Sequence, residues 1–190
     1  MTAWIVIPIK PPGTGKSRLA DRLNAAERGK LVRRMLHHVV AVARETSAVP
    51  HLLGTSRHDL PASLPLIADP GTGLNGAAAA ALELAAARGI DRLLFIPADL
   101  PLVRREDLEA LLAVDCRAVA IAPDRAGKGT NALSLPLPAA RDFIPAYGPD
   151  SFAAHAREAA RLGLACRVVA SSMLALDIDT PQDLADASRS

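Results

Sequence analysis

Lysine and aspartate side chains in this sequence have the types and the order needed for phosphate chemistry. Lys10 and Lys16 flank a short segment rich in Pro and Gly near the N-terminus. Asp99 follows a central apolar run, and Asp177 and Asp179 stand near the C-terminus. Ammonium groups neutralise phosphate oxygens and carboxylates coordinate Mg²⁺. A fold that brought these groups together could therefore bind a nucleoside triphosphate.

The two lysines must be positioned by a strand, a loop and a helix in succession. The apolar run 4–9 predicts a buried strand, and a short helix is expected over residues 17–23. Loop N–H groups, a helix N-terminus and two ammonium groups all favour an anion. We therefore expect residues 13–17 to cover a triphosphate, with Lys10 and Lys16 in contact with it.

The end of this loop is similar to a P-loop but fails its pattern. The motif G-x-x-x-x-G-K-S/T requires a glycine five residues before Gly15, where Lys10 stands. Pro11 and Pro12 also lack the N–H groups that a phosphate-binding loop would use. The pattern therefore argues against a P-loop kinase, and it places a second cation at the end of the strand.

Asp99 lies between two prolines, Pro97 and Pro101, which present its carboxylate at a rigid turn. Such a carboxylate could coordinate Mg²⁺ together with substrate phosphates. It could equally cap the turn by accepting backbone N–H groups. The sequence alone does not decide between these two roles.

A second pair of carboxylates precedes the last helix of the chain. Asp177 and Asp179 point to the same face if their segment is extended. Thr180 and Asp183 predict a capping box, with Pro181 at the first helical position. Asp179 is then left to face the edge of the sheet, where it could share a metal ion with a carboxylate from another strand. This arrangement suits phosphoryl or nucleotidyl transfer.

Polar loops provide candidate contacts for the rest of a nucleotide and for a second substrate. Asn75 and Gly76 stand in a Gly-rich loop that opens a helix, and an amide can read a base edge or a ribose. Thr130, Gly148 and Ser151 stand in two further polar loops that could accept a small carboxylate or phosphate. For both regions the structural alternative is a plain turn with an N-cap.

Strand-like runs alternate with helical patterns along the chain. Further helices are expected over residues 27–44, 74–88, 104–112 and 149–162 and after residue 180. Further strands are expected over residues 51–55, 64–68, 92–97, 118–122, 132–135 and 166–169, the run 132–135 being the candidate for antiparallel insertion. The alternation predicts one α/β domain over residues 1–190, a Rossmann-like three-layer sandwich with a mostly parallel sheet. Ligands bind beyond the carboxyl ends of such strands.

Composition narrows the classes of function. A net charge of +2 without a basic block argues against nucleic acid as a partner, and no apolar run is long enough for a membrane span. Cys116 and Cys166 lack metal or redox spacing, so we expect buried free thiols in a reducing cytoplasm. His37, His38 and His155 lack partners at metal spacing, and we expect them in surface or core packing. The sequence does not decide between a monomer and a homodimer.

Taken together and in order, these segments resemble the 2-phospho-L-lactate/phosphoenolpyruvate guanylyltransferases of deazaflavin coenzyme F-420 biosynthesis. These are nucleotidyltransferases with a nucleotide-diphospho-sugar transferase (glycosyltransferase-A-like) fold. The resemblance covers nearly the whole chain, and the matching segments are Pro-x-Lys and Lys-Ser-Arg-Leu (residues 8–10 and 16–19), Gly-Leu-Asn-Gly (73–76), Pro-Ala-Asp-Leu-Pro (97–101), Gly-Thr-Asn (129–131), Tyr-Gly-Pro-Asp-Ser-Phe (147–152) and Asp-Ile-Asp-Thr-Pro-x-Asp-Leu (177–184). The Pro-Pro-Gly-Thr-Gly insert between the lysines is more Gly-rich than this family suggests, which leaves the lysine contacts open.

The resemblance implies an enzyme that joins GTP to a phosphorylated three-carbon acid and releases pyrophosphate. It implies that the triphosphate is held by Lys10, Lys16 and Arg18, of which Lys10 and Lys16 act in catalysis with Asp99. It also implies that Mg²⁺ is bound by Asp99 and Asp179.

For the remaining contacts the resemblance places Asn75 and Gly76 near the guanosine. Thr130, Gly148 and Ser151 would receive the phosphate or carboxylate of the acid. The acceptor phosphate is already ionised, so direct in-line attack on the α-phosphorus needs no dedicated general base.

Other functions remain open at this stage. A molybdopterin guanylyl- or cytidylyltransferase would have the same fold, and a P-loop-like kinase or a non-catalytic nucleotide-binding module would belong to other classes. The sequence does not choose between phosphoenolpyruvate, 2-phospho-L-lactate and 3-phosphoglycerate as the acceptor, because these acids differ by a double bond or one hydroxyl.

Overall fold

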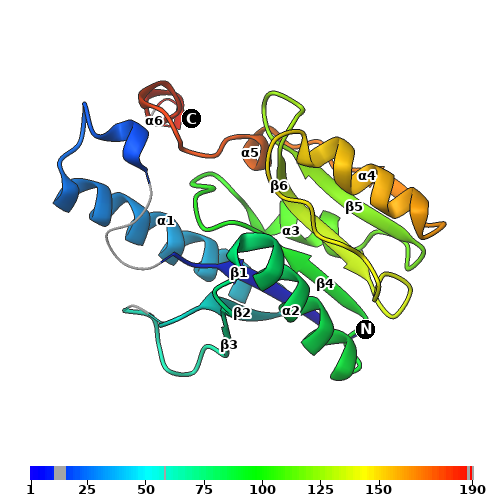
Figure 1. The fold of residues 1–190 in the computed structure, drawn as a ribbon. Coiled ribbons are helices and arrows are strands. Elements are labelled where there is room, and N and C mark those ends of the chain that lie inside the picture. Colours follow the sequence, from blue (N-terminus) through cyan, green and yellow to red (C-terminus); the bar gives the residue numbers. More distant parts are fainter. Residues whose placement is uncertain (11–15, 58, 188, 190) are drawn as a thin grey trace.

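The computed structural model describes residues 1–10, 16–57, 59–187 and 189, and its core is a seven-stranded sheet. The strand order is β3-β2-β1-β4-β6-β5-β7 (Figure 1). The strands are β1 (Ala3–Pro8), β2 (Val49–Gly54), β3 (Leu66–Ala68), β4 (Arg92–Phe95), β5 (Ala118–Pro123), β6 (Thr130–Pro136) and β7 (Ala165–Val168).

The sheet is mostly parallel, as the alternation of strands and helices predicted. β1 pairs in parallel with β2 and with β4, β2 with β3, and β5 with β7. β6 runs antiparallel to both of its neighbours, β4 and β5, so the expected antiparallel insertion is confirmed. The α/β fold with one mostly parallel sheet is therefore confirmed.

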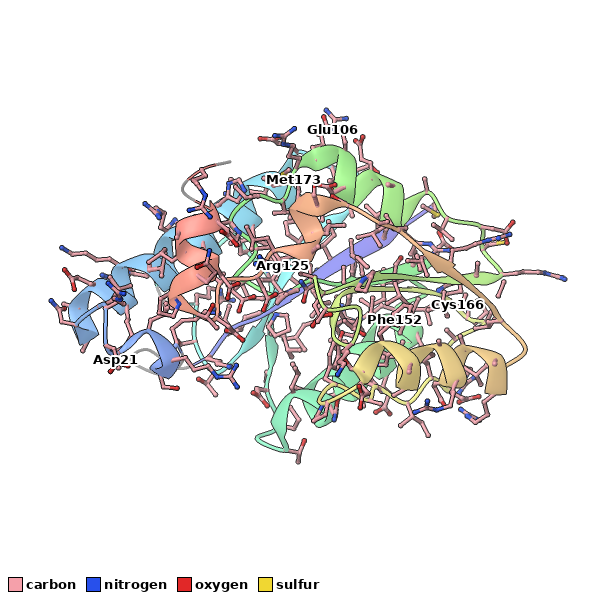
Figure 2. The ribbon with its side chains drawn as sticks, turned by 90° about the horizontal axis from the view of Figure 1, so that it is seen from above. Asp21, Glu106, Arg125, Phe152, Cys166 and Met173 are labelled. Atoms are coloured by element: carbon pink, nitrogen blue, oxygen red, sulfur yellow. The ribbon has the colours of Figure 1, made fainter. Side chains whose placement is uncertain are left out.

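Helices cover both faces of the sheet and give three layers. The helices are α1 (Ala25–Arg44), α2 (Gly73–Ala87), α3 (Arg105–Leu112), α4 (Ser151–Arg161), α5 (Ser172–Ala175) and α6 (Pro181–Ala187). Residues of α1, α3 and α5 pack in one apolar cluster and those of α2 and α4 in another. Figure 2 shows Glu106 on α3 and Phe152 on α4 on opposite sides of the sheet.

Successive side chains of β1 pack alternately into the two apolar clusters. Ile5 and Ile7 belong to the cluster with α1 and α3, whereas Trp4 and Val6 belong to the cluster with α2 and α4. Successive side chains of a strand point to opposite faces, so a strand that is apolar throughout is buried on both. The core is aliphatic, as the low aromatic content of the chain requires.

The start of the second helix differs from the expectation. The helix expected over residues 17–23 is only a short 3₁₀ turn, η1 (Ser17–Leu19), and α1 begins at Ala25. The cause is a capping box: the Asn24 side chain accepts from the Glu27 backbone N–H, and the Glu27 carboxylate accepts from the Asn24 N–H. This Asn-x-x-Glu signal can be found in the sequence.

The cysteine prediction was half wrong. Both thiols are free, but Cys116 is exposed and Cys166 is only partly buried. Cys116 lies in the turn between α3 and β5, and Cys166 lies on the edge strand β7, which has a neighbour on one side only (Figure 2). The apolar residues next to Cys116 and Cys166 in the sequence therefore did not predict the exposure of the two side chains. Among the described residues, no helix has the length and apolar character needed to cross a membrane.

Candidate active site

A cavity of about 490 Å³ opens at the carboxyl ends of β1 and β4. These two strands are adjacent, and the chain continues from β1 to β2 toward one edge of the sheet and from β4 to β5 toward the other edge. Ligands bind at such a topological switch point in open α/β sheets. The polar lining residues are Lys10, Lys16, Asp69, Asp99, Thr130, Asn131, Tyr147, Asp177 and Asp179.

Lys16 joins two of the predicted carboxylates. Its ammonium Nζ lies 2.5 Å from Asp99 Oδ2 and 2.8 Å from Asp179 Oδ1, although these residues are 83 and 163 positions away in sequence. The Lys16 side chain is only 7% exposed. Burial by itself would lower the pKa of Lys16, but Asp99 and Asp179 outweigh it and raise that pKa, so the group is an ammonium at neutral pH.

The backbone at Lys16 contributes to this arrangement. Lys16 has φ 55° and ψ 32°, the left-handed conformation, and precedes η1 as its N-cap residue. Left-handed backbone is uncommon for a residue with a side chain and is found often at functional sites. The ion pairs with Asp99 and Asp179 hold the lysine in place.

Asp177 lies beside this group but has a different partner. Burial, together with the negative charge of Asp99, raises the pKa of Asp177. The Asn131 amide donates to Asp177 Oδ1 at 3.3 Å and to the Leu174 carbonyl at 2.9 Å. Asn131 is buried on β6, and its two hydrogen bonds connect that strand to the segment between β7 and α6.

Asp99 and Asp179 are the two carboxylates placed to share a divalent cation. Asp99 and Asp179 accept hydrogen bonds from one ammonium group, so their oxygens converge on one positive charge. Carboxylate oxygens are the ligands that Mg²⁺ prefers. Over the part of the chain that the structure describes, no group of three His, Cys, Asp or Glu side chains could hold a metal by itself. The pair therefore fits Mg²⁺ when a bound phosphate supplies further ligands.

The other predicted phosphate ligands are less closely placed. Lys10 is exposed and lines the cavity at the end of β1. Arg18 is exposed on η1 and is not among the lining residues. The predicted triphosphate cover, residues 13–17, falls mostly outside the described residues, which resume at Lys16.

The described contacts of Asn75 and Gly76 are structural ones with neighbouring residues. The Asn75 side chain accepts from the Tyr147 N–H at 2.6 Å and donates to the Tyr147 carbonyl at 3.1 Å. It thereby ties α2 to residues 145–150, which we call the 145–150 loop. A Cβ on Gly76 would lie 1.9 Å from the Oγ1 atom of Thr72, so only glycine allows this close approach. Asn75 and Gly76 are not among the residues that line the cavity.

Thr130, Gly148 and Ser151 lie in or beside the 145–150 loop. Thr130 lines the cavity at the start of β6, and its hydroxyl lies 3.0 Å from His155 Nδ1. Gly148 has φ 140°, a conformation that a side chain would strain. Ser151 is the first residue of α4 and is buried, and its backbone N–H donates to the Gly148 carbonyl at 3.2 Å. The 145–150 loop and the N-terminus of α4 therefore form one unit.

Comparison with known proteins agrees with this geometry. The family model described as "Guanylyl transferase CofC like" matches residues 3–187. The chain belongs to this family. A phosphoenolpyruvate guanylyltransferase of Sphaerobacter thermophilus is 40% identical over 194 residues, covering 97% of this chain and 91% of that protein. A 2-phospho-L-lactate guanylyltransferase of Methanoregula boonei is 36% identical over 186 residues, covering 98% and 82%.

Solved structures place the CofC-like chain among nucleotidyltransferase folds. A protein from Desulfovibrio desulfuricans G20, named as a nucleotide-diphospho-sugar transferase, matches with a TM-score of 0.75 at 21% identity. The match covers 97% of this chain and 85% of that one. The 2-C-methyl-D-erythritol 4-phosphate cytidylyltransferase of Thermus thermophilus matches with a TM-score of 0.57 at 17% identity, covering 100% and 98%. The predicted fold family is confirmed.

Sequence reasoning missed several residues of this CofC-like site. Asp69, Asn131 and Tyr147 line the cavity, and His155 contacts Thr130. Asp69 and Asn131 could have been found from the sequence. Asn131 is the last residue of the Gly-Thr-Asn motif, and Asp69 precedes the Gly-rich loop that contains Asn75. The contact between His155 and Thr130 spans 25 positions and leaves no trace in the sequence. His155 was expected in surface or core packing, and the structure places it in the core, fully buried.

Proposed function

We propose that this protein transfers a guanylyl group from GTP to a phosphorylated three-carbon acid and releases pyrophosphate. The observation that carries the proposal is the convergence of Asp99 and Asp179 on Lys16 within the cavity of a CofC-like chain. Two carboxylates, a cation and a switch-point cavity form a site for phosphorus chemistry. The names of the relatives support phosphoenolpyruvate or 2-phospho-L-lactate as the acceptor. A role in coenzyme F-420 biosynthesis, which the sequence resemblance implies, is part of the same proposal.

The nucleotide base has an apolar wall and one carboxylate available to it. Leu53, Leu74, Ala77 and Phe95 line the cavity, and so does Asp69, whose Oδ1 atom also accepts from the Gly71 N–H at 2.8 Å. A carboxylate can accept from both N–H groups on the Watson–Crick edge of guanine, and apolar side chains favour a flat ring. Adenine offers no such pair of donors on that edge. Asp69 therefore supports GTP as the nucleotide.

The triphosphate would lie between the end of β1 and the carboxylates. Lys10 lines this part of the cavity, and Lys16 can exchange part of its ion pairing with Asp99 and Asp179 for phosphate oxygens. Asp99 and Asp179 would hold Mg²⁺. When bound, that ion neutralises phosphate charge and orients the pyrophosphate leaving group.

The acceptor would bind at Thr130, Gly148 and Ser151. These residues provide a hydroxyl, a backbone position open to close approach and the start of a helix. An oxygen of the acceptor phosphate attacks the α-phosphorus of GTP, the bond to the β-phosphate oxygen breaks, and pyrophosphate leaves. The attacking oxygen is already ionised, so the protein contributes position and charge stabilisation and no proton transfer is needed.

Pyrophosphate release from GTP, Mg²⁺ and phosphoenolpyruvate or 2-phospho-L-lactate tests the proposal. We expect Asp99→Asn to lower kcat by a factor of about 10²–10³, because a charge-stabilising contact in the transition state is lost. Asp142→Asn is a matched control, since the Asp142 side chain is 76% exposed and is not among the lining residues. Full activity of Asp99→Asn would remove Asp99 from the metal site and contradict the proposal.

A further inference from the structure

His155 is a fully buried histidine beside the cavity that the proposed reaction does not use. It lies on α4, and its ring packs edge-on against Tyr147 with 4.9 Å between the ring centroids. Phe143 lies on another side, with 5.8 Å between centroids. Burial lowers the pKa of His155 to about 4, so the ring is neutral at neutral pH. A neutral imidazole donates from one nitrogen and accepts at the other.

The backbone decides which nitrogen of His155 accepts. The Ala146 N–H donates to His155 Nε2 at 2.9 Å, and a backbone N–H can only donate. Nε2 therefore carries the lone pair, and the proton of the neutral ring is on Nδ1. This proton meets the Thr130 hydroxyl oxygen, which lies 3.0 Å from Nδ1.

The tautomer of His155 in turn sets the role of Thr130. Because Nδ1–H donates, Thr130 Oγ1 accepts, and its own proton remains to be donated elsewhere. Thr130 lines the cavity, and the described contacts give this hydroxyl no partner other than His155. The hydroxyl is thus prepared to donate to an acceptor atom of a ligand in the cavity.

We propose that His155 is a positioning residue for the second substrate: its Nδ1–H makes the Thr130 hydroxyl a fixed donor toward an anionic oxygen of the phosphorylated acid. This inference rests on the proposed function, since it assigns the Thr130 side of the cavity to the acceptor. His155 never touches the substrate. It also accepts from the Ala146 N–H, and this hydrogen bond fixes the orientation of the ring.

Two substitutions separate the two hydrogen bonds of His155. In His155→Asn the side-chain amide N–H can occupy the place of Nδ1 and still donate to Thr130, but the acceptor for Ala146 is lost. In His155→Gln the longer side chain reaches the place of Nε2 and can accept from Ala146, but the donor to Thr130 is lost. We expect His155→Gln to raise the acceptor KM about five- to tenfold, while His155→Asn stays within about twofold of the wild type. Neither should change the Kd for GTP.

A double-mutant cycle tests whether His155 acts through Thr130. Thr130→Val keeps the shape of the side chain and removes the hydroxyl, and it should raise the acceptor KM by a similar factor. Adding His155→Gln to Thr130→Val should then raise the KM no further. His37→Asn, an exposed histidine on α1, is the control for loss of an imidazole and should leave all constants unchanged.

The tautomer itself is measured by nitrogen NMR of the imidazole, which does not require turnover. A protonated Nδ1 and unprotonated Nε2 support the proposal, and the opposite tautomer overturns it. Equal acceptor KM values for the Asn and Gln variants, or additive effects in the cycle, would also overturn it. Absence of any guanylylated product from the wild type would refute the proposed function instead, and the NMR result would still decide the hydrogen-bond arrangement.

Discussion

Acidification should weaken the fold through His155, and its effect can be isolated by substitution. The histidine is fully buried and its pKa is lowered to about 4, whereas an unfolded chain has a histidine pKa of about 6.5. Between these two values the unfolded state binds the proton and the folded state does not. Stability therefore falls as the pH decreases from about 6.5 to about 4.

The two pKa values give the size of this effect. Each unit of difference corresponds to about 1.4 kcal/mol once the pH lies below both values, which sets an upper bound of about 3.5 kcal/mol. At pH 4.5 the loss relative to pH 7 should be about 2.5 kcal/mol. The nearby Glu158 carboxylate favours the charged ring, but burial is the larger influence.

Urea denaturation of wild type and His155→Gln at pH 7.0 and pH 4.5 measures this difference. The free energy of unfolding should fall more in the wild type than in the variant, and the excess should be about 2.5 kcal/mol. The same substitution at the exposed His37 is the control for altered composition. If wild type and His155→Gln lose equal stability between the two pH values, the reasoning about a buried neutral ring is refuted.

Three further substitutions test the architecture around the cavity. Asp69→Ala should reduce the preference for GTP over ATP at least about tenfold in pyrophosphate release, because the guanine N–H groups lose their acceptor; unchanged preference would exclude Asp69 from base recognition. Asn75→Ala should raise the acceptor KM several-fold with little change in GTP affinity measured by calorimetry, since Asn75 holds the 145–150 loop, where the acceptor is proposed to bind; a larger effect on GTP would assign Asn75 to the nucleotide. In thermal unfolding, Gly76→Ala should destabilise the fold by about 1–3 kcal/mol, because the new Cβ meets Thr72. Gly29→Ala should stabilise the fold by about 0.5–1 kcal/mol, because a Cβ there enters open space on α1. Changes of the same sign for both variants would contradict the packing.

The sequence predicted the sheet and the two carboxylates for a clear physical reason. Continuous apolar runs such as those of β1 and β4 belong to strands buried on both faces, and the residues that follow them must lie at one edge. Asp99, which follows β4, therefore lies at this edge as expected. Asp179 was expected at the end of a strand but follows the helix α5, and it meets Asp99 at Lys16. The Thr180–Asp183 capping box was also confirmed, because such signals are local.

Long-range partners could not be predicted in the same way. Lys16 was expected on a phosphate, and in the structure its partners are Asp99 and Asp179. The placement of Asn75 at the guanosine stays a prediction, and the contact of its amide with the backbone of Tyr147, 72 positions away, was not foreseen. Hydrogen bonds between residues so far apart in the sequence depend on how the loops fold over the edge of the sheet. The pattern of residue types in one sequence does not predict that folding. The exposure of Cys116 was missed because the residue lies just before a strand that is itself buried.

The central claim is guanylyl transfer to a phosphorylated acid, and mass spectrometry of the reaction products tests it most directly. The purified protein is incubated with GTP, Mg²⁺ and an equal mixture of phosphoenolpyruvate, 2-phospho-L-lactate and 3-phosphoglycerate. The account predicts one of these acids joined to guanosine monophosphate, with pyrophosphate in equal amount. Formation of GDP with a newly phosphorylated product, or no change in any of the three acids, would contradict it.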